Sequence, residues 1–265
     1  MLVSVAVAPW PPALVPQLMG RAAPELDSLR VALDATLRGV VRPLTTAGAP
    51  DTRGDGARSS GAGEPGPGLA AGQIVVVGPG EHAEFDAAGV VSFADFGPDV
   101  QVPALPGGDH QLSADLPTPL MVGRYLAHRV VGEHPAGDAL WACARWMTTD
   151  AERASSVGAA LRDDSRPTSL VLLVDGAASH GPKAPRAEDS RAGRFDDLVA
   201  DALESGDPAR LAAVDLELAH ELGADGAHLW QLLAAAAAGA SWQGELAWRG
   251  QPYGVGWTVA SWRRR

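Results

Sequence analysis

The chain has 265 residues, of which 46% are hydrophobic and 20% are charged. This composition is that of a globular protein, and it excludes a wholly disordered or fibrous one. The formal net charge is −11. Because an acidic surface repels phosphate backbones, we expect no nucleic-acid partner. One hydrophobic core can serve about 250 residues, so we predict a single α/β domain over residues 1–265.

Cysteine content and hydropathy set expectations for the compartment. Cys143 is the one cysteine of the chain, which excludes an internal disulfide and a cysteine-rich zinc site. We therefore expect a reducing, cytoplasmic location. The sequence has no run of about 18 apolar residues, so we expect no membrane-spanning segment. Residues 1–8 are apolar without basic residues and are followed by prolines, which indicates a strand rather than a signal peptide.

The first 72 residues predict a strand, a helix and a long polar segment. The apolar run Leu2–Ala8 ends at prolines and predicts a buried strand. Leucines at helical spacing predict a helix that opens at Pro24 and continues to about Val41. Residues 45–72 contain eight glycines and three prolines with almost nothing apolar. Such a segment cannot contribute to a core, and we expect a flexible loop.

The remaining segments alternate between strand-like and helix-like patterns. Apolar or alternating runs predict strands at residues 74–77, 90–93, 139–147 and 169–174. Helical spacing predicts helices at residues 118–131, 150–161, 195–204, 208–222 and 226–238. Asp207 and Asp225 are the expected N-caps of the last two helices. The tail, residues 245–262, alternates around a Pro-Tyr-Gly turn and predicts a C-terminal β-hairpin. This order indicates an α/β protein with a mainly parallel or mixed central β-sheet flanked by helices.

Two predicted strands are each followed within a few residues by a histidine. His82 follows the strand at residues 74–77, and His180 follows the strand at residues 169–174. Ligands of parallel sheets bind beyond the carboxyl ends of the strands. An imidazole there can bind a divalent metal or transfer a proton near neutral pH. A surface histidine in a polar loop is the alternative interpretation for each of them.

Four short motifs in a fixed order point to a known family. They are the proline-rich loop at residues 8–16, the segment Glu81–Phe85, the segment Gly176–His180 and the segment Pro252–Trp257. Together they extend over nearly the whole chain, and their order resembles the class III extradiol ring-cleavage dioxygenase family in its catalytic B-subunit-like form. No Gly-x-Ser-x-Gly elbow, Walker loop or Gly-x-Gly-x-x-Gly motif after a strand is present.

The resemblance implies a metal centre and a proton-transfer residue. Members of that family hold Fe(II) with two histidines and one carboxylate, which leaves open positions for a catechol and O₂. Carried over by motif, His82 is the second histidine ligand and His180 is the acid/base histidine. The first histidine ligand falls on Trp10, whose indole cannot ligate iron. The carboxylate ligand falls on Gly226, next to Asp225.

This departure from the family pattern leaves three interpretations open. The protein is a fold relative that has lost the standard iron chemistry, or a metal enzyme with substitute ligands, for which Glu81 and Asp225 are the candidates. The third interpretation is a metal-free binding module in which Trp10 stacks on a small aromatic ligand. The tryptophan-rich tail also makes a homo-oligomer possible, since tryptophan is enriched at protein interfaces.

Overall fold

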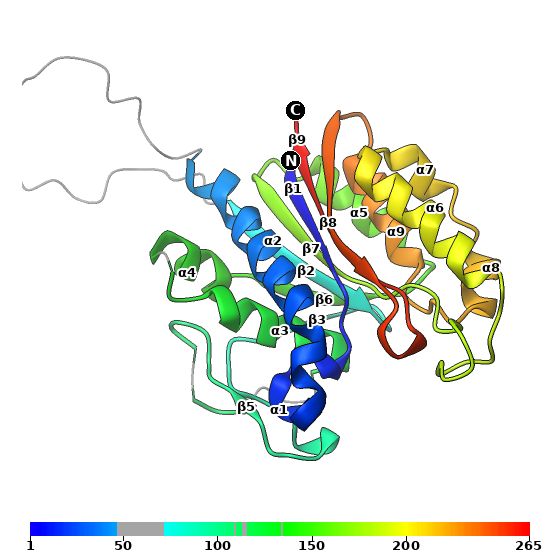
Figure 1. The fold of residues 1–265 in the computed structure, drawn as a ribbon. Coiled ribbons are helices and arrows are strands. Elements are labelled where there is room, and N and C mark those ends of the chain that lie inside the picture. The colour runs from blue at the N-terminus through cyan, green and yellow to red at the C-terminus, as the bar shows by residue number, and fades with distance from the viewer. Residues whose placement is uncertain (47–71, 109, 113–115, 134) are drawn as a thin grey trace, which may run out of the picture.

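The protein has a three-layer α/β fold, with helices on both faces of a central mixed sheet (Figure 1). A computed structural model describes residues 1–46, 72–108, 110–112, 116–133 and 135–265. The strands in chain order are β1 (Leu2–Ala8), β2 (Gln73–Pro79), β3 (Ala83–Phe85), β4 (Val91–Ser92), β5 (Gln101–Val102), β6 (Arg145–Thr149), β7 (Thr168–Leu173), β8 (Trp242–Gly250) and β9 (Trp257–Arg264). The helices are α1 (Pro16–Met19), α2 (Asp27–Thr46), α3 (Thr118–Val130), α4 (Pro135–Ala142), α5 (Ala154–Asp163), α6 (Ala192–Ser205), α7 (Pro208–Ala212), α8 (Leu216–Glu221) and α9 (His228–Ala237).

The central sheet is parallel in its middle and antiparallel at its sides. Its strand order is β3-β6-β2-β7-β1-β9-β8, and β6, β2, β7 and β1 run parallel to one another. β3 pairs antiparallel with β6, and β9 pairs antiparallel with both β1 and β8. The expected α/β class, mixed central sheet and C-terminal β-hairpin are therefore all observed. β4 and β5 form a separate two-stranded sheet.

The apolar residues of the strands supply two hydrophobic clusters, one on each face of the sheet. In β2, Val75 and Val77 pack into the cluster of α5–α9, whereas Ile74 and Val76 pack into the cluster of α2–α4. This alternation follows from the two-residue period of a strand. Because both faces are covered, the central strands read as continuous apolar runs in the sequence. Each such side chain contributes about 1.5–3 kcal/mol on burial.

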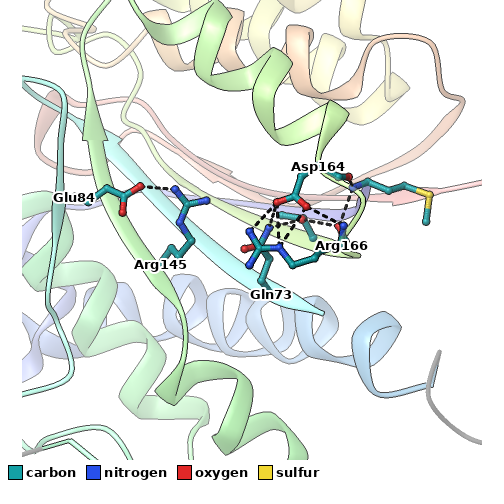
Figure 2. Close-up of polar contacts among 7 residues, drawn as sticks. Gln73, Glu84, Arg145, Asp164 and Arg166 are labelled. Carbon is teal, nitrogen blue, oxygen red and sulfur yellow. Dashed lines mark hydrogen bonds and ion pairs between the residues drawn. The ribbon is translucent and has the colours of Figure 1, made fainter. Parts of the chain in front are cut away.

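Hydrogen bonds centred on Asp164 tie the amino ends of β2 and β7 together (Figure 2). The Asp164 carboxylate accepts from Arg166 at 2.9 Å and from the Gln73 amide at 2.9 Å. The same amide nitrogen of Gln73 donates to Thr168 Oγ1 at 2.9 Å. The ammonium group of Met1, at the start of β1, donates to the carbonyl of Arg166 at 2.7 Å. This edge of the sheet is thus held by contacts among its own residues.

Two predicted elements differ from the observed ones, and local hydrogen bonds explain the differences. Residues 139–142 belong to the helix α4 rather than to a strand, and the buried side chain of Trp141 anchors that helix to the core. The strand β6 begins only at Arg145. The single helix expected at residues 208–222 is two helices. Asp207 caps α7 as expected, but Asp215 accepts from two backbone N–H groups and caps a second helix, α8.

Other boundaries move by a few residues. α2 starts at Asp27, after a 3₁₀ segment at Gly20–Leu26 that contains Pro24. α9 starts at His228, and Asp225 does not cap it, since Ala227 occupies the N-cap position. Most of the loop expected at residues 45–72 lies outside the described residues. Within the described part of the chain, no helix has both the length and the apolar character needed to cross a membrane.

Candidate functional site

The topology brings three loops to one edge of the sheet. Strands β2, β7 and β1 are adjacent and parallel, so their carboxyl ends point the same way. His82 follows β2, His180 follows β7 and Trp10 follows β1. The backbone N–H of Trp10 donates to Asp175 Oδ1 at 3.1 Å, which joins the loop after β1 to the loop after β7.

His180 forms a buried pair with a carboxylate from α6. Its Nε2 lies 2.6 Å from Asp196 Oδ2, and the two side chains are 10% and 9% exposed. The backbone N–H of Ala177 donates to the other carboxylate oxygen at 3.0 Å. Burial raises the pKa of Asp196, against the opposing effects of the hydrogen bonds from Ala177 and His180. The pairing fixes the orientation of the imidazole and leaves Nδ1 as the ring nitrogen that is not engaged with Asp196.

Two glycines allow the Asp196 carboxylate to reach His180. A Cβ at Gly176 or at Gly256 would overlap the carboxylate of Asp196. The two glycines are also joined to each other, since the N–H of Gly176 donates to the carbonyl of Gly256 at 2.7 Å. The N–H of His180 donates to the carbonyl of Gly254 at 3.1 Å. The loop after β7 and the turn before β9 therefore enclose the pair from both sides.

A second carboxylate lies in the same loop. Burial raises the pKa of Asp175 to about 7, and the nearby negative charge of Asp196 raises it further, whereas the N–H of Trp10 opposes the shift. Asp175 lies two residues after the end of β7, and the residue as a whole is half-buried. Asp175 from the loop and Asp196 from α6 thus both have raised pKa values, and Asp196 is bonded to an imidazole, a combination that is suited to proton transfer.

His82 lies at the same edge of the sheet, but no hydrogen bond or ion pair among the described residues joins it to His180 or Asp196. Its side chain is partly buried, and Nδ1 has no hydrogen-bond partner among the described residues. Its backbone N–H bonds to the carboxylate of Asp150. The neighbouring Glu81 is exposed, and its carbonyl accepts from Thr148 Oγ1. Glu84, further along, forms an ion pair with Arg145 on the neighbouring strand β6 (Figure 2).

Asp225 and Gly226 occupy different surroundings. Asp225 is 63% exposed and pairs with Arg186 at 3.4 Å and with His220 at 3.9 Å. Gly226 faces the carboxyl edge, because a Cβ built on it would lie 3.4 Å from Val174 and 3.5 Å from Pro79. The position that the family resemblance assigns to a carboxylate is thus at the sheet edge, but a glycine occupies it.

These surroundings do not fit an Fe(II) centre. Among the described residues, no group of three or more His, Cys, Asp or Glu side chains could hold a metal ion. Trp10 presents a buried indole nitrogen, which cannot ligate a metal, in place of a histidine. Asp225 is engaged with Arg186 at the surface. Of the three ligand positions that the resemblance implies, His82 is the one that carries a side chain able to bind a metal.

Several polar atoms at or near this edge are buried without partners. Among the described residues these are Trp10 Nε1, His82 Nδ1, Ser179 Oγ and Trp257 Nε1. Buried polar atoms are normally hydrogen-bonded, so unpartnered ones require an explanation such as a ligand or water. Five surface cavities are formed by described residues elsewhere, and neither Trp10, His82 nor His180 lines any of these five.

The sequence interpretation missed Asp196 and Asp175. Asp196 stands on the buried face of α6 between Phe195 and Val199. A carboxylate on the apolar face of a helix is a signal for a buried polar partner, and the pattern was available in the sequence. Asp175 gives no comparable signal, because an Asp-Gly pair after a strand is typical of an ordinary turn.

Comparisons with known proteins do not identify a family. No family model matches the sequence, and no curated protein matches it. Among solved structures, the chain is similar to the uncharacterized protein JW3007 from Escherichia coli K12. The identity is 14%, the alignment covers 98% of this chain and 99% of the other, and the TM-score is 0.41.

Proposed function

We propose that this protein is an extradiol-dioxygenase-like protein with a degenerate metal site and reduced or altered activity. The observation that supports the proposal is the buried His180–Asp196 pair at 2.6 Å, at a sheet edge where the described residues gather no set of metal ligands. On this proposal, His180 serves as the acid/base residue that the resemblance implies, whereas Trp10 and Gly226 stand at two of the implied ligand positions.

The chemistry that remains is proton transfer to or from a small ligand. With Nε2 bonded to Asp196, the Nδ1 atom of His180 is the proton acceptor that faces outward from the pair. Asp175, whose pKa is about 7, is a second group that changes protonation near neutral pH. A small aromatic molecule is the ligand class, because the indole of Trp10 offers a flat stacking surface.

A non-catalytic small-molecule-binding role is the second candidate. The unpartnered donors Trp10 Nε1 and Ser179 Oγ favour it, because a bound ligand with acceptor atoms would satisfy both. In this case His180 and Asp196 hold the loops in place and transfer no proton.

One pair of assays tests the proposal and separates the candidates. The protein is incubated anaerobically with Fe(II), then mixed with protocatechuate or catechol, and O₂ consumption is followed. We expect no ring cleavage above the rate with free Fe(II). Binding of the same compounds is followed through tryptophan fluorescence in the wild type, His180→Asn and Trp10→Phe. Steady ring cleavage by the wild type would contradict the degenerate-site proposal, and undiminished binding to His180→Asn would favour the non-catalytic role.

A further inference from the structure

A groove at the opposite end of the sheet concentrates positive charge. Its volume is about 860 Å³, and it lies between the C-terminal half of α2 and the end of β9. Its lining consists of Val3, Ala35, Arg38, Gly39, Arg42, Pro43, Arg263, Arg264 and Arg265. Five of the chain's 21 basic residues thus line one groove, and no acidic side chain is among the described lining residues. This local excess of positive charge contrasts with the net charge of −11 of the whole chain.

The positive charge of the groove is only partly compensated. Arg38 forms a bidentate pair with Glu133, at 2.6 and 2.7 Å, and Arg42 also has a partner of its own. Arg263 lies 3.9 Å from Glu245, and both side chains are at least 60% exposed, which makes this pair weak. The guanidinium group of Arg265 has no hydrogen bond or ion pair among the described residues.

The groove continues along α2 as an elongated channel. A second cavity of about 540 Å³ shares Ala35, Gly39 and Arg263 with the first. Much of its α2 wall is built of small side chains, and its lining also includes the hydroxyl-bearing residues Ser28 and Ser261, together with Glu245, which lies 3.9 Å from Arg263. α2 has 20 residues, which corresponds to a length of about 30 Å.

We propose that this channel docks an extended acidic segment of a partner protein. The forked guanidinium groups of Arg263 and Arg265 match carboxylates. The small side chains of α2 let a peptide backbone lie close to the wall, and the hydroxyls can bond to it. The arginine-lined part has no aromatic side chain on which a base could stack.

Fluorescence anisotropy with a labelled octaglutamate peptide tests the proposal on the full chain at low salt. We compare the wild type with R263Q/R265Q and with the control R162Q/R210Q. Both variants change the net charge from −11 to −13. The control removes exposed arginines of α5 and α7, 41% and 58% exposed, outside the channel. Circular dichroism melting checks that each variant folds, and Arg265→Gln alone serves as a milder second variant.

We expect the peptide to bind the wild type and R263Q/R265Q to weaken binding about tenfold, since each exposed ion pair contributes roughly three- to fivefold. The control should stay within about twofold, and salt near 0.5 M should abolish binding by screening. The proposal is overturned if the wild type does not bind the peptide or if both double variants weaken binding equally. Tighter, arginine-dependent binding of an oligothymidylate of equal charge would overturn it in favour of a nucleic-acid site.

Discussion

Asp196 is the residue on which the geometry of the candidate site depends. Its carboxylate accepts one bond from His180 and one from the backbone of Ala177, both in buried surroundings. We predict that Asp196→Ala lowers the free energy of unfolding by about 1–3 kcal/mol, because the Ala177 N–H loses its partner. Asp201→Ala, an exposed position on the same helix, is the matched control and should have a small effect. Equal values for the two variants in urea denaturation would show that the pair is not formed.

The raised pKa of Asp175 predicts that the free energy of unfolding depends on pH. Its pKa is raised to about 7 in the folded protein, above the value near 3.9 of an unperturbed aspartate. The folded state therefore holds this proton between about pH 4 and pH 7, where the unfolded chain has lost it. The stabilisation that Asp175 gives the folded state is fully present below about pH 4 and is lost as the pH rises through about 7. The free energy of unfolding falls by up to about 1.4 kcal/mol per pH unit in between.

Asp175→Asn removes this dependence and keeps an oxygen that can accept from Trp10. We predict that the difference in unfolding free energy between Asp175→Asn and the wild type grows from pH 4 to pH 7 in favour of the variant. Urea denaturation at several pH values measures it. A difference that is constant across this range would mean that the Asp175 carboxyl ionises as an exposed group does.

The candidate residues were predictable from the sequence to different degrees. His82, His180 and Trp10 could be located because each follows a strand whose apolar pattern is clear. The partner of His180 could not be identified in that way, because Asp196 is 16 residues away and only packing of α6 brings it near. The exposed position of Asp225 and its ion pair with Arg186 could not be predicted either, because Arg186 lies in another loop.

The β8–β9 hairpin closes one side of the sheet through its tryptophans. Trp262 is fully buried and donates from Nε1 to the carbonyl of Leu203 at 2.7 Å. Trp248 is half-buried and contacts Ser28 from the outer strand. We predict that Trp262→Ala costs about 3–5 kcal/mol of unfolding free energy, and that Trp248→Ala costs clearly less. Thermal or urea unfolding checks both, and similar costs would contradict the assigned packing.

Elements were predictable where a single periodic pattern extends over the whole segment. The runs of β1, β2 and β7 are apolar throughout, and the strands were placed to within one or two residues. The split between α7 and α8 depends on the Asp215 cap in the middle of a helical pattern. The strand expected at residues 139–147 failed because a short helix and a short strand adjoin there without a strong turn signal.

The two ends of the sheet differ in how their polar groups are satisfied. At the amino end, Asp164, Arg166 and Thr168 form a connected set of hydrogen bonds (Figure 2). At the carboxyl end, Trp10 Nε1 and Ser179 Oγ are buried without partners among the described residues. Gln73 Oε1 at the amino end is also buried without a partner among the described residues. Ligand sites of α/β sheets lie at the carboxyl end, so Trp10 Nε1 and Ser179 Oγ stand where a ligand is expected.

Metal affinity tests most directly the central claim, that the ligand positions implied by the resemblance carry an incomplete set of metal ligands. Fe(II) is titrated anaerobically into the wild type and into Trp10→His/Gly226→Glu by calorimetry. Gly226 has room for a side chain, because a Cβ there makes only ordinary contacts with Val174 and Pro79. We predict no stoichiometric Fe(II) binding by the wild type and a gain of about one site in the double variant, provided that both melt cooperatively. Tight binding of one Fe(II) per wild-type chain would contradict the account and would show that other residues complete the site.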